Sequence, residues 1–296
     1  MAVYKRSYRP YTGRLTPAWS RFFVLTRYAL RGLFRSKFLT AFFVLCFFPP
    51  LGCAIAIYLS HNASVLALVH SRANELINVN AKFFLGFLGV QSGLAFFLTA
   101  FIGPNSIAPD LANGALPLYF CRPFSRAEYV LGKLCALFYA LSLITWVPGL
   151  ILFGIEASLS QAPARVHFLL NETWMWQNRS LAIGVFLGSI VWILMISLIA
   201  MALSAWVKWR IAAGALVLGV MFFLSGFGAA INAVMRSNIG HYINPGSLIT
   251  RVCAQMFGLD SPIDISATSA WIALLVICGL CLLLLGKKVR AFEVVR

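Results

Sequence analysis

The sequence predicts an all-α membrane protein with six transmembrane helices. Of its 296 residues, 61% are hydrophobic and only 11% are charged, a balance far from that of a soluble globular domain. The charges are clustered, and between the clusters lie six windows of 22 to 28 residues without Asp, Glu, Lys or Arg. As a helix rising about 1.5 Å per residue, each window crosses a hydrocarbon core roughly 30 Å thick. A transmembrane barrel is disfavoured because its strands would alternate in polarity, whereas these windows are continuously apolar.

The predicted spans divide the chain into a cytoplasmic lead with an amphipathic helix (1–37), a transmembrane domain (38–286) and a cytoplasmic tail (287–296). The six spans lie at about 38–60, 83–104, 130–155, 180–206, 211–233 and 267–286. Prolines fall inside the first and third spans, at Pro49, Pro50 and Pro148. We expect them to kink these helices rather than end them, because neighbouring helices can satisfy the carbonyls that proline frees.

Basic residues are unevenly divided between the two sides of this topology. With the N-terminus in the cytoplasm, the inner segments carry 18 Lys and Arg residues and the outer segments carry six. The positive-inside rule therefore favours an N-in, C-in orientation. Topology and anionic lipid explain the net charge of +16 better than nucleic acid does, because no soluble basic domain is present to bind nucleic acid.

Ahead of the first span, the run TPAWSRFFVLTRYALRGLFRSK predicts an amphipathic helix that lies in the cytoplasmic interface. The Thr-Pro pair at 16–17 is typical of a helix start. Trp19 and other large apolar residues share about a third of the helical wheel, and Arg27, Arg31 and Arg35 recur on an adjacent face. We expect the rings at the acyl boundary and the arginines directed toward lipid phosphate or a partner; the alternative is a simple topology anchor.

The longest outer connection, 236–264, has two interpretations. A run of small residues leads into it: Ser225, Gly226, Gly228, Ala229 and Ala230. Small residues permit close helix packing or a helix break at membrane depth. The connection is therefore either a half-inserted segment or an ordinary outer loop.

Several chemistries lack their usual residues. No charged side chain or histidine lies inside the six windows, which disfavours an ion-driven secondary transporter unless residues such as Gln91, Ser92, Thr145 and Asn232 coordinate Na⁺. The Gly-Lys of VLGKL, at 130–134, lacks the upstream Gly and the following Ser or Thr of a phosphate loop. The four histidines lack metal-ligand spacing. We expect no catalytic site, metal or cofactor in this chain.

The densest polar chemistry lies in the inner loop between spans two and three. Helix-breaking residues open this loop and allow a short helix between turns: Pro104, Pro109, Asn113, Gly114 and Pro117. Pro123 biases Arg122 away from the helical conformation, and Ser125 can cap a helix that begins near Arg126. Asp110 lies near both arginines in sequence, so an Asp–Arg pair would hold the loop as a rigid elbow.

This loop resembles the inner-loop motif of ABC-2 type transporter permeases, in which an acidic residue precedes a GTL-like turn, an SRPxSR run and a GK pair. Here the corresponding residues are Asp110, GALPLYF, RP, SR and GK, so the match covers 110–133 closely. The interfacial helix, six spans and long last outer loop extend it loosely. Asp110 stands where Glu is frequent, and Cys121 stands where Ser is common. The residues to which the resemblance assigns coupling are Asp110, Gly114, Arg122, Pro123, Ser125, Arg126, Gly132 and Lys133.

The resemblance implies a permease subunit of an ATP-driven exporter in the bacterial cytoplasmic (inner) membrane, moving an unidentified substrate. Such a subunit pairs with a second permease copy or a homologous permease, contacts membrane lipids, and binds cytoplasmic ABC ATP-binding subunits. ATP and Mg²⁺ would then be held by those partner subunits, and this chain would have no enzymatic activity. The alternative is a membrane scaffold or assembly subunit with a permease-like fold and no transport of its own.

Overall fold

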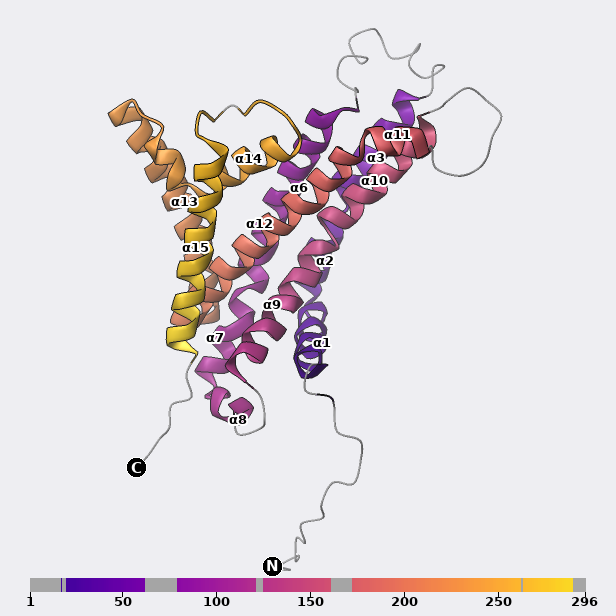
Figure 1. Ribbon diagram of the computed structural model, residues 1–296. Helices are drawn as coiled ribbons and strands as arrows, with labels where there is room; N and C mark the ends of the chain where they lie inside the picture. The colour runs from indigo at the N-terminus through magenta and orange to yellow at the C-terminus, as the bar shows by residue number, and fades with distance from the viewer. Residues whose placement is uncertain are drawn as a thin grey trace, which may run out of the picture.

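The computed structural model describes residue 17 and residues 20–61, 79–120, 125–160, 172–261 and 263–289. Every regular element in this part of the chain is a helix. Six stretches are long and apolar enough to cross a membrane, and Figure 1 shows them as a splayed bundle. The predicted all-α class is confirmed, and the architecture is that of a multi-pass helical membrane protein.

Three of the six stretches are single helices and three are interrupted. The interrupted ones are α2 (Lys37–Leu45) with α3 (Phe48–Ser60), α6 (Ala81–Ile102) with α7 (Pro104–Ala112), and α9 (Arg126–Ser142) with α10 (Trp146–Leu159). The single helices are α12 (Arg179–Trp206), α13 (Arg210–Met235) and α15 (Ala267–Lys288). The shorter elements are α1 (Arg21–Phe34), α8 (Leu116–Phe120), α11 (Glu172–Gln177), the 3-10 helix η2 (Ile239–Tyr242) and α14 (Pro245–Met256).

Helix α12 is the centre of the bundle. It packs against α6, α7, α9, α10, α13, α14 and α15. Of its most apolar window 61% is buried, against 22% for α13 and α15. The outer helices therefore present most of their apolar side chains outward, as helices that face lipid or another subunit do.

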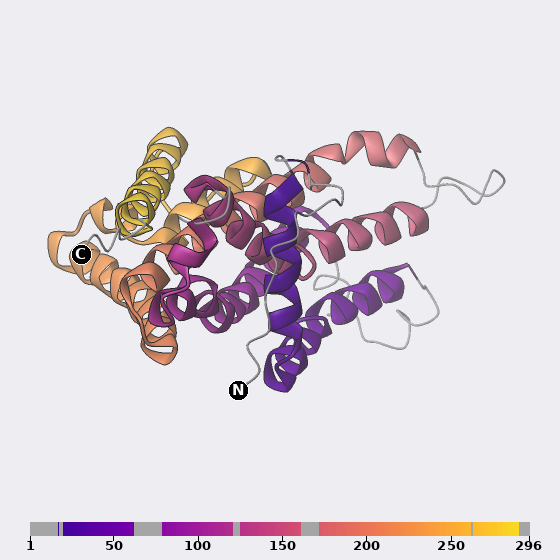
Figure 2. The same cartoon turned by 90° about the horizontal axis from the view of Figure 1, so that it is seen from below.

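The two ends of the bundle carry different elements. Helices α1 and α8 and the C-terminal end of α15 lie at one end, whereas α11 and α14 lie toward the other (Figure 1). Seen from below, α1 crosses the lower end of the bundle (Figure 2). Helix α1 and the C-terminal end of α15 thus lie at the same end of the bundle, which agrees with an orientation in which both chain ends are on one side; which side that is stays a prediction.

Spans one and three are interrupted beside their prolines, and one glutamine donates to two of the carbonyls that the prolines free. Pro50 cannot donate to the carbonyl of Cys46, and Pro148 cannot donate to that of Ile144, four residues earlier in each case. Gln91 of α6 donates from Nε2 to the Cys46 carbonyl at 2.8 Å and also to the Ile144 carbonyl. Both spans therefore continue past their prolines, and α6 is joined to both breaks.

The connection after α13 folds back into the bundle. Arg236 ends α13 in the left-handed conformation, with φ of 48°. The turn then packs so closely on α13 that a Cβ on Gly228 would lie 2.5 Å from the Gly240 carbonyl oxygen. After this turn, Cys253 of α14 packs against Gly188, which lies well inside α12. A Cβ on Gly188 would lie 3.2 Å from the Sγ of Cys253. The connection is therefore packed against α13 and α12, while its depth in the membrane stays a prediction.

Candidate functional site

Asp110 and Lys133 form a mostly buried ion pair that joins α7 to α9. Lys133 Nζ lies 2.9 Å from Asp110 Oδ2, and the Tyr129 hydroxyl donates to the same oxygen at 2.7 Å. The Tyr129 ring lies 5.6 Å from Lys133 Nζ and packs against the ring of Tyr119 in α8. Burial, and then the Asp110 charge, raise the pKa of Tyr119 above its ordinary value, so this phenol stays neutral. Asp110 of α7 thus receives two polar contacts from α9, and α8 packs against one of the two contacting residues.

The cation that pairs with Asp110 is Lys133 rather than an arginine. The predicted pairing is wrong for Arg126, which is exposed and makes no ion pair with Asp110 in the described structure. Arg122 and Pro123 lie outside the described residues. Lys133 can reach Asp110 because it follows Tyr129 by four residues, so the side chains of Lys133 and Tyr129 lie on the same face of α9.

Ser125 caps α9 as predicted, and the helix begins at Arg126. The Ser125 hydroxyl accepts a hydrogen bond from the Glu128 backbone N–H at 3.2 Å. Glu128 Oε2 accepts one in return from the Ser125 N–H at 2.6 Å. This reciprocal capping box satisfies two backbone donors and sets the point where the helix starts.

Gly132 is the point at which α1 crosses α9. A Cβ at this position would lie 3.0 Å from both the Phe22 carbonyl oxygen and the Leu25 side chain. Thr26 of α1 donates its hydroxyl hydrogen to the Gly132 carbonyl oxygen at 3.0 Å. The two residues of the Gly-Lys pair therefore have different structural roles. Gly132 allows α1 to pack closely on α9, and Lys133 forms the ion pair with Asp110.

Helix α7 is fixed at both ends. The Ser204 hydroxyl of α12 accepts from the Ala108 backbone N–H at 3.0 Å and donates to the Pro104 carbonyl at 3.2 Å. At its other end, Gly114 has φ of 60°, in the left-handed region that favours glycine, and the chain reverses there toward α8. We call α7, α8 and the start of α9 the elbow; it is bonded to α12 through Ser204 and to α1 through Gly132.

Sequence reasoning missed three residues that hold the elbow: Thr26, Tyr129 and Ser204. The four-residue spacing of Tyr129 and Lys133 was a usable signal. Thr26 and Ser204 gave none, because each bonds to a residue about a hundred positions away in the chain.

The predicted interfacial helix corresponds to α1, which begins at Arg21 rather than near residue 16. Its Arg27, Arg31 and Arg35 side chains are exposed and line one groove beside α9. Trp19 lies outside the described residues. The three arginines thus share a face, as the spacing predicted.

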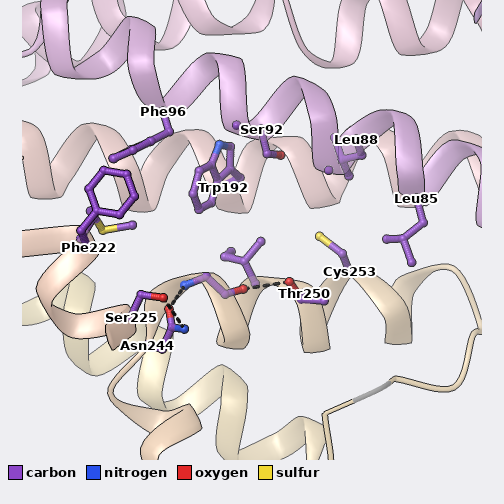
Figure 3. A pocket seen from close by; sticks show the side chains of 15 residues that line it. Leu85, Leu88, Ser92, Phe96, Trp192, Phe222, Ser225, Asn244, Thr250 and Cys253 are labelled. Carbon is purple, nitrogen blue, oxygen red and sulfur yellow. Dashed lines mark hydrogen bonds between the residues drawn. The ribbon is translucent and has the colours of Figure 1, made fainter. Parts of the chain in front are cut away.

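A cavity of about 340 Å³ lies between α6, α12, α13 and α14 (Figure 3). Its lining is mainly apolar and includes Phe96 of α6, Trp192 of α12 and Phe222 of α13 (Figure 3). A few neutral polar side chains join them: Ser92, Ser225, Asn244 and Thr250. None of the lining residues is charged. The cavity can therefore hold an uncharged, mainly apolar molecule or group.

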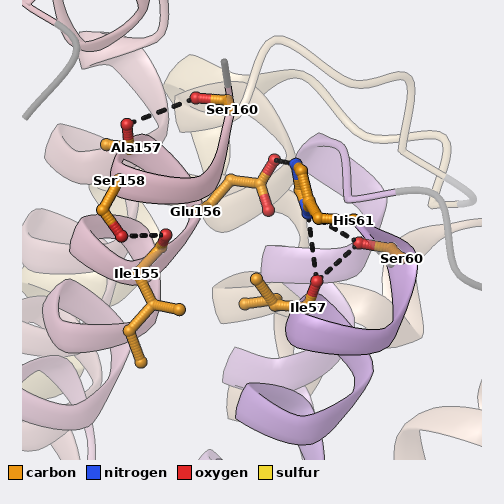
Figure 4. Close-up of polar contacts among 8 residues, drawn as sticks. All are labelled: Ile57, Ser60, His61, Ile155, Glu156, Ala157, Ser158 and Ser160. Carbon is orange, nitrogen blue, oxygen red and sulfur yellow. Dashed lines mark hydrogen bonds and ion pairs between the residues drawn. The ribbon is translucent and has the colours of Figure 1, made fainter. Parts of the chain in front are cut away.

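The third span ends at Leu159, beyond the predicted 155, so Glu156 lies in α10 rather than in the outer segment. Glu156 is buried, and its Oε1 lies 3.5 Å from His61 Nε2 at the end of α3 (Figure 4). His61 Nδ1 lies 3.0 Å from the Ile57 carbonyl oxygen. This pair joins the ends of spans one and three that lie away from α1.

No group of three His, Cys, Asp or Glu side chains within the described ranges is arranged to hold a metal ion. A scan against protein-family models and a search of curated proteins find no match to this chain. The residues thus define a class, a multi-pass helical membrane protein with a braced polar elbow. The resemblance to ABC-2 type permeases stays a prediction that rests on the motif itself.

Proposed function

We propose that this chain is the permease subunit of an ATP-driven, ABC-2 type exporter of the bacterial inner membrane. The observation that carries the proposal is the elbow, in which the motif residues Asp110, Ser125, Gly132 and Lys133 make the contacts described above and Gly114 makes the turn. A loop that only marked topology would need basic residues there. It would not need a buried ion pair, a capping box and a helix crossing within one short segment.

An elbow that is bonded to the neighbouring helices can move as a rigid body, which is what coupling requires. A partner that moves α8 and the start of α9 also moves α7 through Asp110–Lys133, and it moves α1 through Gly132. Ser204 carries the same displacement to the central helix α12. Closure of a cytoplasmic ATP-binding subunit would then reach the spans as a rigid-body shift.

Arg126 is the residue that we expect to contact the ATP-binding subunit. It is exposed at the first position of α9 and makes no ion pair within the described part of the chain. A cation in the first turn of a helix is unfavourable for the helix dipole. We infer that Arg126 pairs with a carboxylate of the ATP-binding subunit.

The neutral cavity beside α14 is the place where we expect the transported molecule to bind. Its apolar lining and few hydroxyl and amide groups suit an uncharged substrate with a large apolar part. A strongly ionic substrate would find no partner for its charge among the lining residues.

Affinity purification from the native membrane in mild detergent tests the proposal. We expect an ATPase with a phosphate-binding loop to co-purify in stoichiometric amount. The substitution Arg126→Glu should reduce its recovery about tenfold or more, since a contact between opposite charges becomes one between like charges. Lys208→Glu, the same charge change at another exposed position, should leave recovery unchanged. Purification of the intact chain without any such ATPase would contradict the proposal.

A further inference from the structure

The groove between α1 and α9 combines three cations with a long apolar wall. Its volume is about 940 Å³. Helix α1 contributes Arg27 and Arg31, the residue that caps its C-terminal end is Arg35, and the facing wall belongs to α9 and α10. Because α1 crosses the lower end of the bundle (Figure 2), the cations lie at that end and the wall rises from it.

The arginines have no acidic partner in the described structure. The ion pairs there are Lys133–Asp110 and His61–Glu156, and α1 itself carries no acid. Arg27, Arg31 and Arg35 are all exposed, and their four-residue spacing places the guanidinium groups in a row. A row of guanidinium groups is suited to a phosphate group, which it can bind in bidentate fashion.

The facing wall is suited to an acyl chain. Its lining residues follow one side of α9 and the start of α10: Cys135, Phe138, Tyr139, Ser142 and Trp146. From the first to the last the helices rise about 16 Å, which is roughly half of a 30 Å hydrocarbon core. The Tyr139 side chain remains 52% exposed. An apolar wall of this length extends through one leaflet.

We propose that this groove binds one anionic phospholipid, with its phosphate on Arg27, Arg31 and Arg35 and an acyl chain along α9 and α10. Charge complementarity selects the anionic class, because a zwitterionic headgroup would bring a cation among three arginines. The apolar wall distinguishes a lipid from free phosphate, which would leave that wall uncovered. The site depends on the bundle and α1 and not on the proposed transport function.

Native mass spectrometry of the full-length, delipidated protein in detergent tests the proposal. We expect one phosphatidylglycerol molecule to bind at least about tenfold more tightly than phosphatidylcholine. The combined substitution Arg27→Gln, Arg31→Gln and Arg35→Gln should weaken this binding tenfold or more, as electrostatic attraction of roughly this size is expected for three cations. The matched control, Lys208→Gln with Lys287→Gln and Lys288→Gln, removes as many charges elsewhere and should keep the binding.

A second variant and a second ligand separate the two halves of the site. Tyr139→Ala should weaken phosphatidylglycerol binding at least threefold while all arginines remain. Glycerol phosphate, which has the headgroup chemistry and no acyl chain, should bind at least tenfold more weakly than the lipid. Equal binding of the two phospholipids, equal binding of glycerol phosphate, or equal losses in both triple variants would overturn the proposal. So would a folded arginine variant that binds phosphatidylglycerol normally but loses a protein partner.

Discussion

A single carboxylate oxygen, Asp110 Oδ2, receives both the Lys133 ammonium and the Tyr129 hydroxyl. The side chains of Lys133 and Asp110 are only 10% and 17% exposed. At this burial the pair itself adds little net stability, but removal of one partner leaves the other charge unpaired in a poorly solvated place.

We therefore expect Lys133→Met to lower the free energy of unfolding by about 3 kcal/mol. Adding Asp110→Asn to Lys133→Met should recover part of this loss, because the unpaired carboxylate is then gone. Thermal unfolding of the purified protein in one detergent measures both changes. Arg126→Met, at an exposed position of the same helix, is the control and should change stability by less than about 0.5 kcal/mol. An equal loss in the single and double variants would mean that the pair is not responsible.

The contrast between Ser125 and Asp110 shows how far the sequence can predict the elbow. The capping box at Ser125 is local, since cap and acid are three residues apart, and its helix start was predicted correctly. The partner of Asp110 depends instead on how α7 ends and how α9 turns toward it. Nearness in sequence favoured an arginine as the partner of Asp110, whereas the face of α9 that contacts Asp110 carries Lys133.

At the scale of elements, the crossing of α1 and α9 depends on the absence of a side chain at Gly132. We expect Gly132→Ala to destabilise the protein by about 1 to 3 kcal/mol, because the new methyl group meets the backbone of α1. Gly154→Ala in α10 is the matched control, since a Cβ there meets no other atom within 4 Å. That change should be neutral or slightly stabilising, as alanine favours helix over glycine. Similar effects at both positions would contradict the close crossing.

The two proline breaks make a second prediction at this scale. Gln91→Leu should cost about 2 to 4 kcal/mol of unfolding free energy, because two buried carbonyls lose their donor. Adding Pro50→Ala and Pro148→Ala should reduce that cost, since alanine N–H groups can again bond to Cys46 and Ile144. Ser92→Ala, beside Gln91 on α6, is the control. If the cost of Gln91→Leu is unchanged by the proline substitutions, the glutamine does not serve the breaks.

For the bonds between Gln91 and the two proline breaks, only part could be predicted from the sequence. The prolines were predicted to kink their helices rather than end them, but turns divide both spans into two helices; the predicted rescue of freed carbonyls by a neighbouring helix is confirmed at Cys46 and Ile144. The identity of the donor could not be read, because Gln91 lies 45 residues from Cys46 and 53 from Ile144. The sequence singled out Gln91 only as one of four polar residues that could coordinate Na⁺, which gave no signal for its bonds to the two proline breaks.

For the whole molecule, hydropathy was sufficient to predict six spans, because a long apolar helix is required by the membrane itself. It was insufficient for α14, whose return depends on the contact of Gly228 with Gly240 and of Cys253 with Gly188. The run of small residues around Gly228 indicated close packing, but the sequence did not identify Gly240 as its partner or pair Cys253 with Gly188. The cavity beside α14 was for the same reason not predicted.

The elbow, the central helix and the cavity together lead us to expect mechanical coupling across the molecule. The lower end contains the residues that can receive a partner's movement, and α12 passes from the elbow to the cavity lining at Trp192. A scaffold without transport would need the fold but not this connection between its two ends.

The most direct test is the rate of ATP hydrolysis by the chain reconstituted in lipid nanodiscs with its co-purifying ATPase. We predict that Asp110→Asn and Arg126→Ala each lower this rate about fivefold or more, a typical size for coupling between sites. Lys208→Ala should leave the rate unchanged. Assembled complexes in which all three variants hydrolyse ATP at the wild-type rate would contradict coupling through the elbow and would favour the scaffold.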